Sequence, residues 1–214
     1  MKISIVSESP ADEAAIRILI DAVLGISTEP LQPASIRPRG WNHVLGVLPS
    51  IVKHLHYNTD ADGLVVVIDS DQSPAHLPEH DETEGGDSAC RLCQMRRVVG
   101  GTLAHLSEIA GRTTLRMAFG LAMPAIEAWY LCGVLPQVSE ASWINARKSG
   151  KYPYNTVQLK RDVYGTDQPS LAMETQRAEK AARRIVDSKK LELLEQTFAN
   201  GFGTMADSLR RWLD

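Results

Sequence analysis

The sequence predicts an α/β protein in which helices cover a mostly parallel β-sheet. The strongest sign is residues 63–69, Gly-Leu-Val-Val-Val-Ile-Asp, in which five consecutive apolar residues, four of them β-branched, are typical of a central strand buried on both faces. Residues 2–7 and 114–122 also have strand character, and segments with helical spacing separate the three stretches. This alternation predicts right-handed crossovers between parallel strands.

Helices are expected where apolar residues recur every three or four positions. The first follows Ser9-Pro10 and ends at Gly25, because Pro is favoured at a helix start and Gly at its end. A short second strand is expected within residues 31–36. The further expected helices are 41–55, 94–110, 139–147, 156–163, 169–186 and 189–213, with interruptions at Gly150, Pro153, Gly165 and Gly201. The predicted division is an α/β core at residues 1–132, with a loop at 72–93, and a helical C-terminal subdomain at 133–214.

The composition predicts a globular cytoplasmic protein. The chain has 214 residues, of which 43% are hydrophobic, enough for one ordinary core. No apolar run approaches the ~20 residues that span a bilayer, and the first apolar stretch is too short for a signal peptide. We therefore expect no membrane partner. Homo-oligomerisation stays open.

Charge is distributed unevenly along the chain. Residues 1–100 contain 14 acidic and 8 basic side chains, whereas residues 147–190 contain 11 basic and 5 acidic ones. A basic flank beside an acidic site suits an enzyme that acts on nucleic acid, because Lys and Arg bind phosphates. The nucleic-acid-binding residues expected in this flank are Arg147, Lys148, Lys151, Lys160 and Arg161. Taken alone, the flank fits a solvated helix face at least as well.

Carboxylates follow the predicted strands. Glu8 ends the first, Asp69 and Asp71 end the central one, and Glu127 follows residues 114–122. The carboxyl ends of parallel strands meet at one sheet edge, and side chains two apart on an extended chain point the same way. Two adjacent carboxylates repel unless a cation separates them, and oxygen ligands favour Mg²⁺ or Mn²⁺. The alternatives are that the aspartates cap a turn and that Glu127 matches a helix dipole.

A second metal site is predicted in the loop at residues 72–93. His76, His80, Cys90 and Cys93 supply two His and two Cys, with the spacings of a structural zinc site, although the order is reversed from the usual zinc finger. A Cys pair in a chain with only three cysteines also fits a reducing compartment better than a disulfide framework. The alternative is that these side chains bind no metal.

The order of the acidic motifs resembles a known family. Ser7-Glu8 after the first strand and Val67-Ile-Asp69-Ser-Asp71 after the third resemble the Toprim domain of topoisomerases, primases and OLD-type nucleases. With residues 124–129, Pro-Ala-Ile-Glu-Ala-Trp, and a lysine near 159–161, most of the chain is similar to DUF4276, a bacterial family of small Toprim-like proteins.

The resemblance implies a metal-dependent phosphodiesterase that cleaves nucleic acid. In such an enzyme Asp69 and Asp71 hold Mg²⁺ or Mn²⁺, and Glu8 is a further ligand or the base that deprotonates water. Glu127 is then a second-metal ligand, while Lys160 or Arg161 neutralises charge on the phosphate. The resemblance also implies an ATPase partner in antiviral defence or DNA repair.

Two other functions are compatible with the sequence. One is a catalytically inactive Toprim-like module, stapled by zinc, whose basic tail binds a partner such as an ATPase. The other is a haloacid-dehalogenase-type phosphatase with Asp69 as nucleophile, which is disfavoured because a complete strand–helix unit precedes this residue. No Walker loop, dinucleotide loop or Gly-x-Ser-x-Gly elbow follows a predicted strand.

Overall fold

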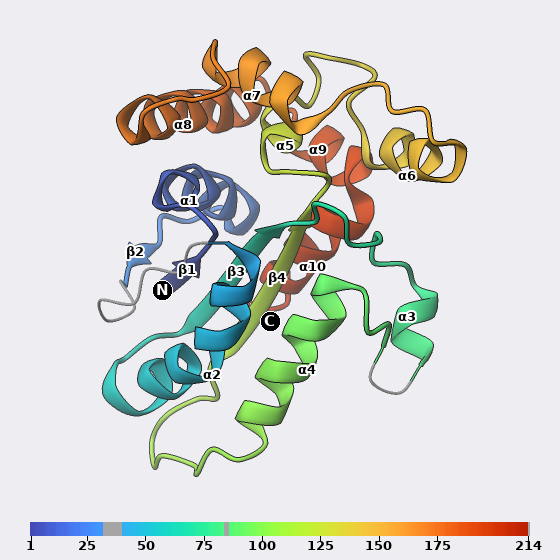
Figure 1. Cartoon of the computed structure of the whole chain (residues 1–214). Helices are drawn as coiled ribbons and strands as arrows, with labels where there is room; N and C mark the ends of the chain where they lie inside the picture. The colour runs from blue at the N-terminus through green and yellow to red at the C-terminus, as the bar shows by residue number, and fades with distance from the viewer. Residues whose placement is uncertain (32–39, 84–85, 214) are drawn as a thin grey trace.

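The computed structural model describes residues 1–31, 40–83 and 86–213 and confirms the α/β class (Figure 1). In this part of the chain, one four-stranded sheet is parallel throughout and has the order β2-β1-β3-β4. The strands are β1 (Lys2–Val6), β2 (Glu29–Pro30), β3 (Gly63–Asp69) and β4 (Arg116–Ala122). The predicted central strand is therefore β3, and its last residue, Asp69, is level with Ala122 of β4.

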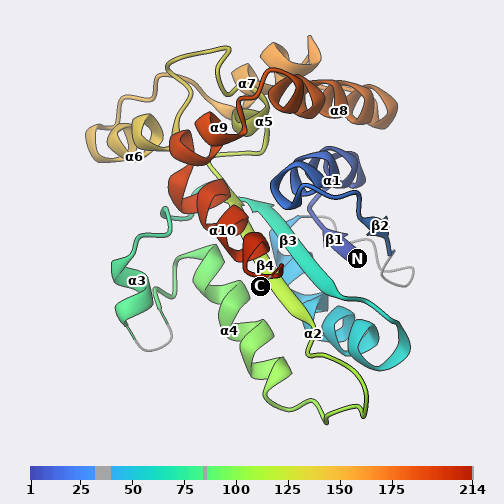
Figure 2. The same ribbon diagram turned by 180° about the vertical axis from the view of Figure 1, so that it is seen from behind.

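Helices cover both faces of this sheet. On one face lie α1 (Pro10–Leu24) and α10 (Thr204–Arg210), and on the other lie α2 (Trp41–Asn58) and α4 (Arg91–Leu103), as Figures 1 and 2 show. The alternation of β3 side chains explains the two layers, because Val65 and Val67 join the apolar cluster of α1 and α10. Val66 and Ile68 join that of α2 and α4. Every β3 residue from Gly63 to Ile68 is buried.

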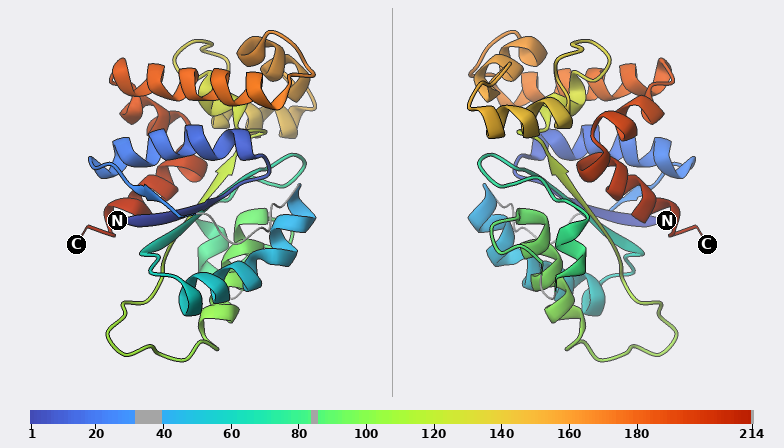
Figure 3. Two further views of the ribbon diagram at one scale, coloured as in Figure 1. Left: turned by 90° about the vertical axis from the view of Figure 1, so that its left-hand side faces the viewer. Right: turned by 90° about the vertical axis from the view of Figure 1, so that its right-hand side faces the viewer.

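A further tier of helices lies beyond α1, on the side of the molecule where the strands end (Figure 3). It contains α5 (Glu127–Tyr130), α6 (Glu140–Ser149), α7 (Thr156–Tyr164), α8 (Leu171–Asp187) and α9 (Leu191–Thr197). α8 packs along α1, and a π-helical turn (Ala199–Gly203) joins α9 to α10. Phe202, Met205 and Leu209 from this C-terminal region belong to the same apolar cluster as β3. Within the described residues, no helix has the length and apolar character needed to cross a bilayer.

Several predicted boundaries were wrong. The expected loop at 72–93 contains the short helix α3 (Glu79–Glu82) and the start of α4. α4 begins at Arg91 and ends at Leu103, whereas 94–110 was expected, because the Gly100-Gly101 pair weakens the helix there. The second strand is Glu29–Pro30, and most of the stretch expected to form it, residues 32–39, lies outside the described residues.

The helical stretch expected over residues 189–213 is interrupted around Gly201, as this glycine indicated, and close packing explains the break. Gly201 lies in the π-helical turn, where an added Cβ would overlap the backbone carbonyl oxygen of Leu121 in β4. A regular helix with side chains at every position would not fit this close to the strand. The break therefore comes from a tertiary contact that helical periodicity does not report.

Gly201→Ala is expected to lower the free energy of unfolding by about 3 kcal/mol, because the new methyl group meets rigid backbone. Gly46→Ala is the matched control. Gly46 lies on the exposed side of α2 with no atom near the added Cβ, so alanine should stabilise the helix by about 0.5–1 kcal/mol. Urea unfolding followed by circular dichroism measures both changes. Equal stability of the two variants would contradict the close contact.

Candidate metal sites

An acidic pocket lies at the carboxyl end of the sheet. It is a cavity of about 210 Å³ whose lining includes five carboxylates, one lysine and one tyrosine. We use the name acidic pocket for this set of side chains: Glu8, Asp12, Asp69, Glu127, Lys160, Tyr164 and Glu174. Glu8 follows β1 and Asp69 ends β3, so the structure brings together two of the predicted acidic residues that are 61 positions apart in the chain.

Helix starts supply the other three carboxylates. Asp12, Glu127 and Glu174 lie in the first turns of α1, α5 and α8. Such positions favour acidic residues through the helix dipole alone. What distinguishes these three is that the helix starts converge on one cavity with Glu8 and Asp69, so that the carboxyl groups repel one another when they ionise.

Hydrogen bonds hold the carboxylates in place. The backbone N–H of Asp69 donates to Oε1 of Glu8 (3.2 Å), and the N–H of Ile126 donates to Oδ1 of Asp69 (2.9 Å). The Tyr130 hydroxyl donates to Oδ1 of Asp12 (3.1 Å). The ends of β1, β3 and β4 and the start of α1 are thus linked through the acidic side chains themselves.

Burial and mutual repulsion keep protons in this pocket. Desolvation, followed by the charge of Glu127, raises the pKa of Asp12 to about 8. Desolvation and then the charges of Glu127, Asp12 and Glu8 raise the pKa of Asp69 well above its usual range. Burial is likewise the largest cause of the raised pKa values of Glu8 and Glu127. A cation in the pocket would reverse this, because it stabilises the ionised carboxylates.

Glu127 is the carboxylate least satisfied by the protein. Its side chain is only 4% exposed, and its Oε2 atom has no hydrogen-bond partner. A buried acceptor without a partner costs about 1–3 kcal/mol or more. Tyr164 and Lys160 on α7 lower the pKa of Glu127, the lysine by its charge and the tyrosine by a hydrogen bond. The open oxygen in a cavity of carboxylates points to a ligand that supplies positive charge.

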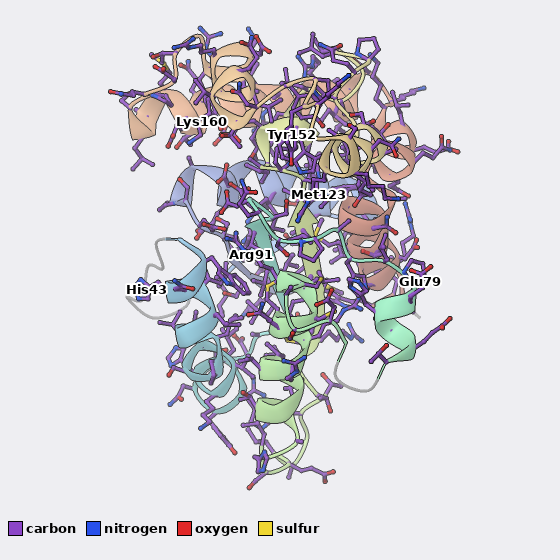
Figure 4. All side chains as sticks on the ribbon, turned by 45° about the vertical axis from the view of Figure 1, so that its right-hand side comes forward. His43, Glu79, Arg91, Met123, Tyr152 and Lys160 are labelled. Atoms are coloured by element: carbon purple, nitrogen blue, oxygen red, sulfur yellow. The ribbon has the colours of Figure 1, made fainter. Side chains whose placement is uncertain are left out.

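Asp71 does not line the acidic pocket. Its Oδ2 atom pairs with Nη1 of Arg91 (2.9 Å), and this nitrogen also donates to the backbone carbonyl of Asp69 (2.6 Å). The expected convergence of Asp69 and Asp71 on one point is therefore replaced by a shared arginine, which also lies 3.7 Å from Oε1 of Glu8. Figure 4 shows Arg91 at the start of α4 and Lys160 in the tier of C-terminal helices.

The predicted His/Cys cluster is brought together by the fold. Nδ1 of His76 lies 3.7 Å from Sγ of Cys90 and 3.5 Å from Sγ of Cys93, and Nδ1 of His80 lies 3.8 Å from Sγ of Cys93. Within residues 1–31, 40–83 and 86–213, this is the one group of three or more His, Cys, Asp or Glu side chains whose donor atoms all lie within 4.8 Å of one another. The cluster is compatible with a bound metal ion.

Charged side chains lie at the outer nitrogens of the two histidines of the cluster. Oδ2 of Asp81 lies 3.3 Å from Nε2 of His76, and Oδ2 of Asp87 lies 3.6 Å from Nε2 of His80. Carboxylates at this position are typical of metal-binding histidines, although at His76 the guanidinium of Arg96 lies closer to the same Nε2 atom (3.1 Å). Gly86, which has a φ of +66°, passes so close to Cys93 that a Cβ would lie 2.7 Å from the sulfur.

The five basic residues predicted to bind nucleic acid are in different environments. Lys160 lines the acidic pocket, Arg161 pairs with Asp167 (2.7 Å), and Arg147 donates to the backbone carbonyl of Ser73. Lys148 and Lys151 are exposed at the end of α6. The flank is therefore not one continuous basic surface.

Some residues of these sites were not identified from the sequence. Asp12 and Glu174 are ordinary helix-start residues by pattern, and Arg91 has no motif at all. The available signal for Asp12 was its position four residues after Glu8, across a strand-to-helix turn. Glu174 and Tyr164 carried no comparable signal, because their place depends on how α7 and α8 pack.

Comparisons with known proteins bring no further information on these sites. No protein-family model matches the sequence. No curated protein and no solved structure matches the chain either.

Proposed function

We propose that the protein is a divalent-metal-dependent phosphodiesterase that acts on nucleic acid. The observation that carries this proposal is the acidic pocket, in which buried and partly buried carboxylates from four separate parts of the chain meet one lysine at the carboxyl end of the sheet. Open α/β sheets bind their ligands at this edge. The Toprim resemblance supports the same chemistry through Glu8 and Asp69.

The pocket fits Mg²⁺ or Mn²⁺ by its donor set. All its acidic ligands are oxygens, Glu127 offers an unpaired Oε2, and the raised pKa values of Asp12 and Asp69 show that added positive charge would be stabilising. Mg²⁺ keeps several waters and is held by one or two carboxylates, so only one or two side chains of the pocket need to contact the ion. When bound, such an ion polarises a phosphoryl oxygen and lowers the pKa of bound water.

The protein side chains have distinct roles in this proposal. Asp69 and Glu127 hold the ion, and Asp12 contributes further negative charge. Glu8, whose carboxylate accepts hydrogen bonds from the Asp69 and Trp41 amides, is the base that accepts a proton from the attacking water. Lys160 binds a non-bridging phosphate oxygen, where its charge offsets the charge that builds up during cleavage. The exposed Lys148 and Lys151 are further contacts for the nucleic-acid backbone.

For the His/Cys cluster we propose structural Zn²⁺. Four ligands at the usual Zn–S and Zn–N lengths, arranged as a tetrahedron, place sulfur and nitrogen about 3.6 Å apart. The observed distances of 3.5–3.8 Å agree with this value. All four ligand positions are filled by protein, as in closed structural sites.

The phosphodiesterase proposal is tested by Mn²⁺ binding as a function of pH, with cleavage of plasmid DNA as the second readout. Because the carboxyl pKa values are raised, Mn²⁺ must displace protons near neutral pH. Its affinity should rise from pH 6 to about pH 8, near the pKa of Asp12, and then level off. Calorimetry in buffers of different ionisation enthalpy measures the released protons.

Glu8→Gln should abolish Mn²⁺-stimulated cleavage, while Glu29→Gln serves as the matched control. Glu29 is exposed in β2, at the amino end of the sheet, and undergoes the same chemical change. Binding that does not vary with pH, together with unchanged cleavage by Glu8→Gln, would exclude the proposed site.

A further inference from the structure

The two metal sites are connected through one residue, Arg91. Cys90 directly precedes α4 and Cys93 lies in its first turn, so the first residue of the helix, Arg91, stands between two ligands of the His/Cys cluster. The backbone N–H of Arg91 donates to Oγ of Ser73 (3.0 Å), which in turn donates to the carbonyl of Ala89 (3.1 Å). The backbone of Arg91 is therefore positioned by Ser73 and by the two cluster cysteines, Cys90 and Cys93, on either side of it.

The Arg91 side chain points away from the cluster and toward the acidic pocket. Its Nη1 atom donates to the carbonyl oxygen of Asp69 (2.6 Å) and to Oδ2 of Asp71 (2.9 Å), and it lies 3.7 Å from Oε1 of Glu8. Its guanidinium carbon is 5.2 Å from the centre of the Trp41 ring, a cation–π contact. One nitrogen therefore contacts the ends of both β1 and β3.

The His/Cys cluster is the main tie of the segment between β3 and α4. In the described residues of this segment the regular structure is α3, which has only four residues. His76 and His80 come from its first half, and Cys90 and Cys93 from the point where it rejoins the core. A shared ion would therefore add to the hydrogen bonds of Ser73 and to the packing of the buried Leu92 in fixing the start of α4 against the sheet.

We propose that metal binding at the His/Cys cluster sets the position of Arg91, and that Arg91 in turn positions Glu8 and the backbone of Asp69 at the rim of the acidic pocket. Arg91 is a positioning residue, since it acts through Glu8 and Asp69. In this proposal Zn²⁺ stabilises the segment around the His/Cys cluster and also affects the geometry of the acidic pocket. The inference rests on the proposed function only in treating the acidic pocket as a metal site. Its test measures amide exchange and Mn²⁺ affinity in addition to cleavage.

Hydrogen exchange of the Asp69 amide is the direct test, because this amide donates to Glu8. Removing zinc from the full-length protein with a chelator should speed its exchange at least about tenfold, and Arg91→Gln should do the same with zinc still bound. The two changes together should have no larger effect than either alone, because they act through the same contact. Arg97→Gln, an exposed arginine of the same helix, is the control and should leave the exchange unchanged.

Mn²⁺ affinity is the second readout. Arg91→Gln removes a cation next to Glu8, so Mn²⁺ should bind about tenfold more tightly, while Arg91→Lys keeps the charge and should stay within about threefold of the wild type. If zinc-loaded Arg91→Gln keeps both the wild-type Asp69 exchange and the wild-type Mn²⁺ affinity, the inference is wrong. If zinc removal speeds exchange only in residues 76–83, the ion stabilises only its own segment and the inference is wrong. Unchanged exchange would overturn the inference whether or not the protein cleaves DNA, whereas absent cleavage with coupled exchange would count against the proposed function alone.

Discussion

Asp69→Asn is expected to inactivate the protein and at the same time to make its metal-free form more stable. Asparagine keeps the oxygen that accepts the hydrogen bond from Ile126, so the local structure is preserved. It removes the charge that a divalent ion requires, and Mn²⁺-dependent cleavage should fall by about 10³-fold or more. Mn²⁺ should no longer raise the melting temperature.

The gain in stability follows from the direction of the pKa shift. The pKa of Asp69 is well above its usual range in the fold, so the folded protein retains this proton more strongly than the unfolded chain does. The stability that the carboxyl contributes below about pH 4 is therefore lost as the pH rises toward its folded pKa. Near pH 8 without metal, Asp69→Asn should be more stable than the wild type by about 1–3 kcal/mol.

Thermal unfolding in EDTA and in Mn²⁺ distinguishes these effects, with Glu29→Gln again as the variant that changes neither. A mutation that damaged the fold would lower stability in both conditions. If Asp69→Asn retains wild-type Mn²⁺ affinity, the acidic pocket does not hold the ion.

Loss of the His/Cys site is expected to cause the largest fall in stability. Cys93→Ser should reduce bound zinc from about one equivalent to less than a tenth and lower the free energy of unfolding by about 3 kcal/mol or more, because ion binding contributes directly to folding. Without the ion, burial still raises the pKa of the Cys90 thiol, and the variant is left with a buried polar cluster that has weak internal contacts. Elemental analysis of untagged protein and urea unfolding give the two quantities.

Cys132→Ser is the matched control for this change. Cys132 is a free, buried cysteine outside the cluster, and the Thr197 side chain offers a hydrogen bond that a serine could also use. Its replacement should cost about 1 kcal/mol and leave zinc content at one equivalent. Zinc below a tenth of an equivalent in the wild-type protein would show that the cluster is not a zinc site.

The sequence was most informative where one local pattern decides the structure. The apolar run before Asp69 predicted the central strand, and the rule that parallel strands end at one edge predicted that Glu8 and Asp69 would meet. The His and Cys spacing predicted a cluster that the fold does form. In each case, residues close in sequence or at the ends of neighbouring strands carry the information.

The sequence was least informative where packing between distant segments decides the structure. Glu174 reaches the acidic pocket because α8 packs along α1, and the π-helical turn around Gly201 exists because β4 passes close to it. Asp71 has the spacing of a ligand, but its side chain is held by Arg91, a residue 20 positions later whose placement depends on the His/Cys cluster. Periodicity and motif spacing do not report contacts between segments that are far apart in the sequence.

The ring of Trp41 is an intrinsic fluorescent probe of the region around Arg91. Of the four tryptophans, Trp129, Trp143 and Trp212 are buried, whereas Trp41 is partly open to solvent and lies against the guanidinium of Arg91. A nearby cation and changing hydration both alter indole emission. The fluorescence of unlabelled protein, detected at the long-wavelength side of the emission where exposed indoles dominate, should therefore follow the movement of this arginine in real time.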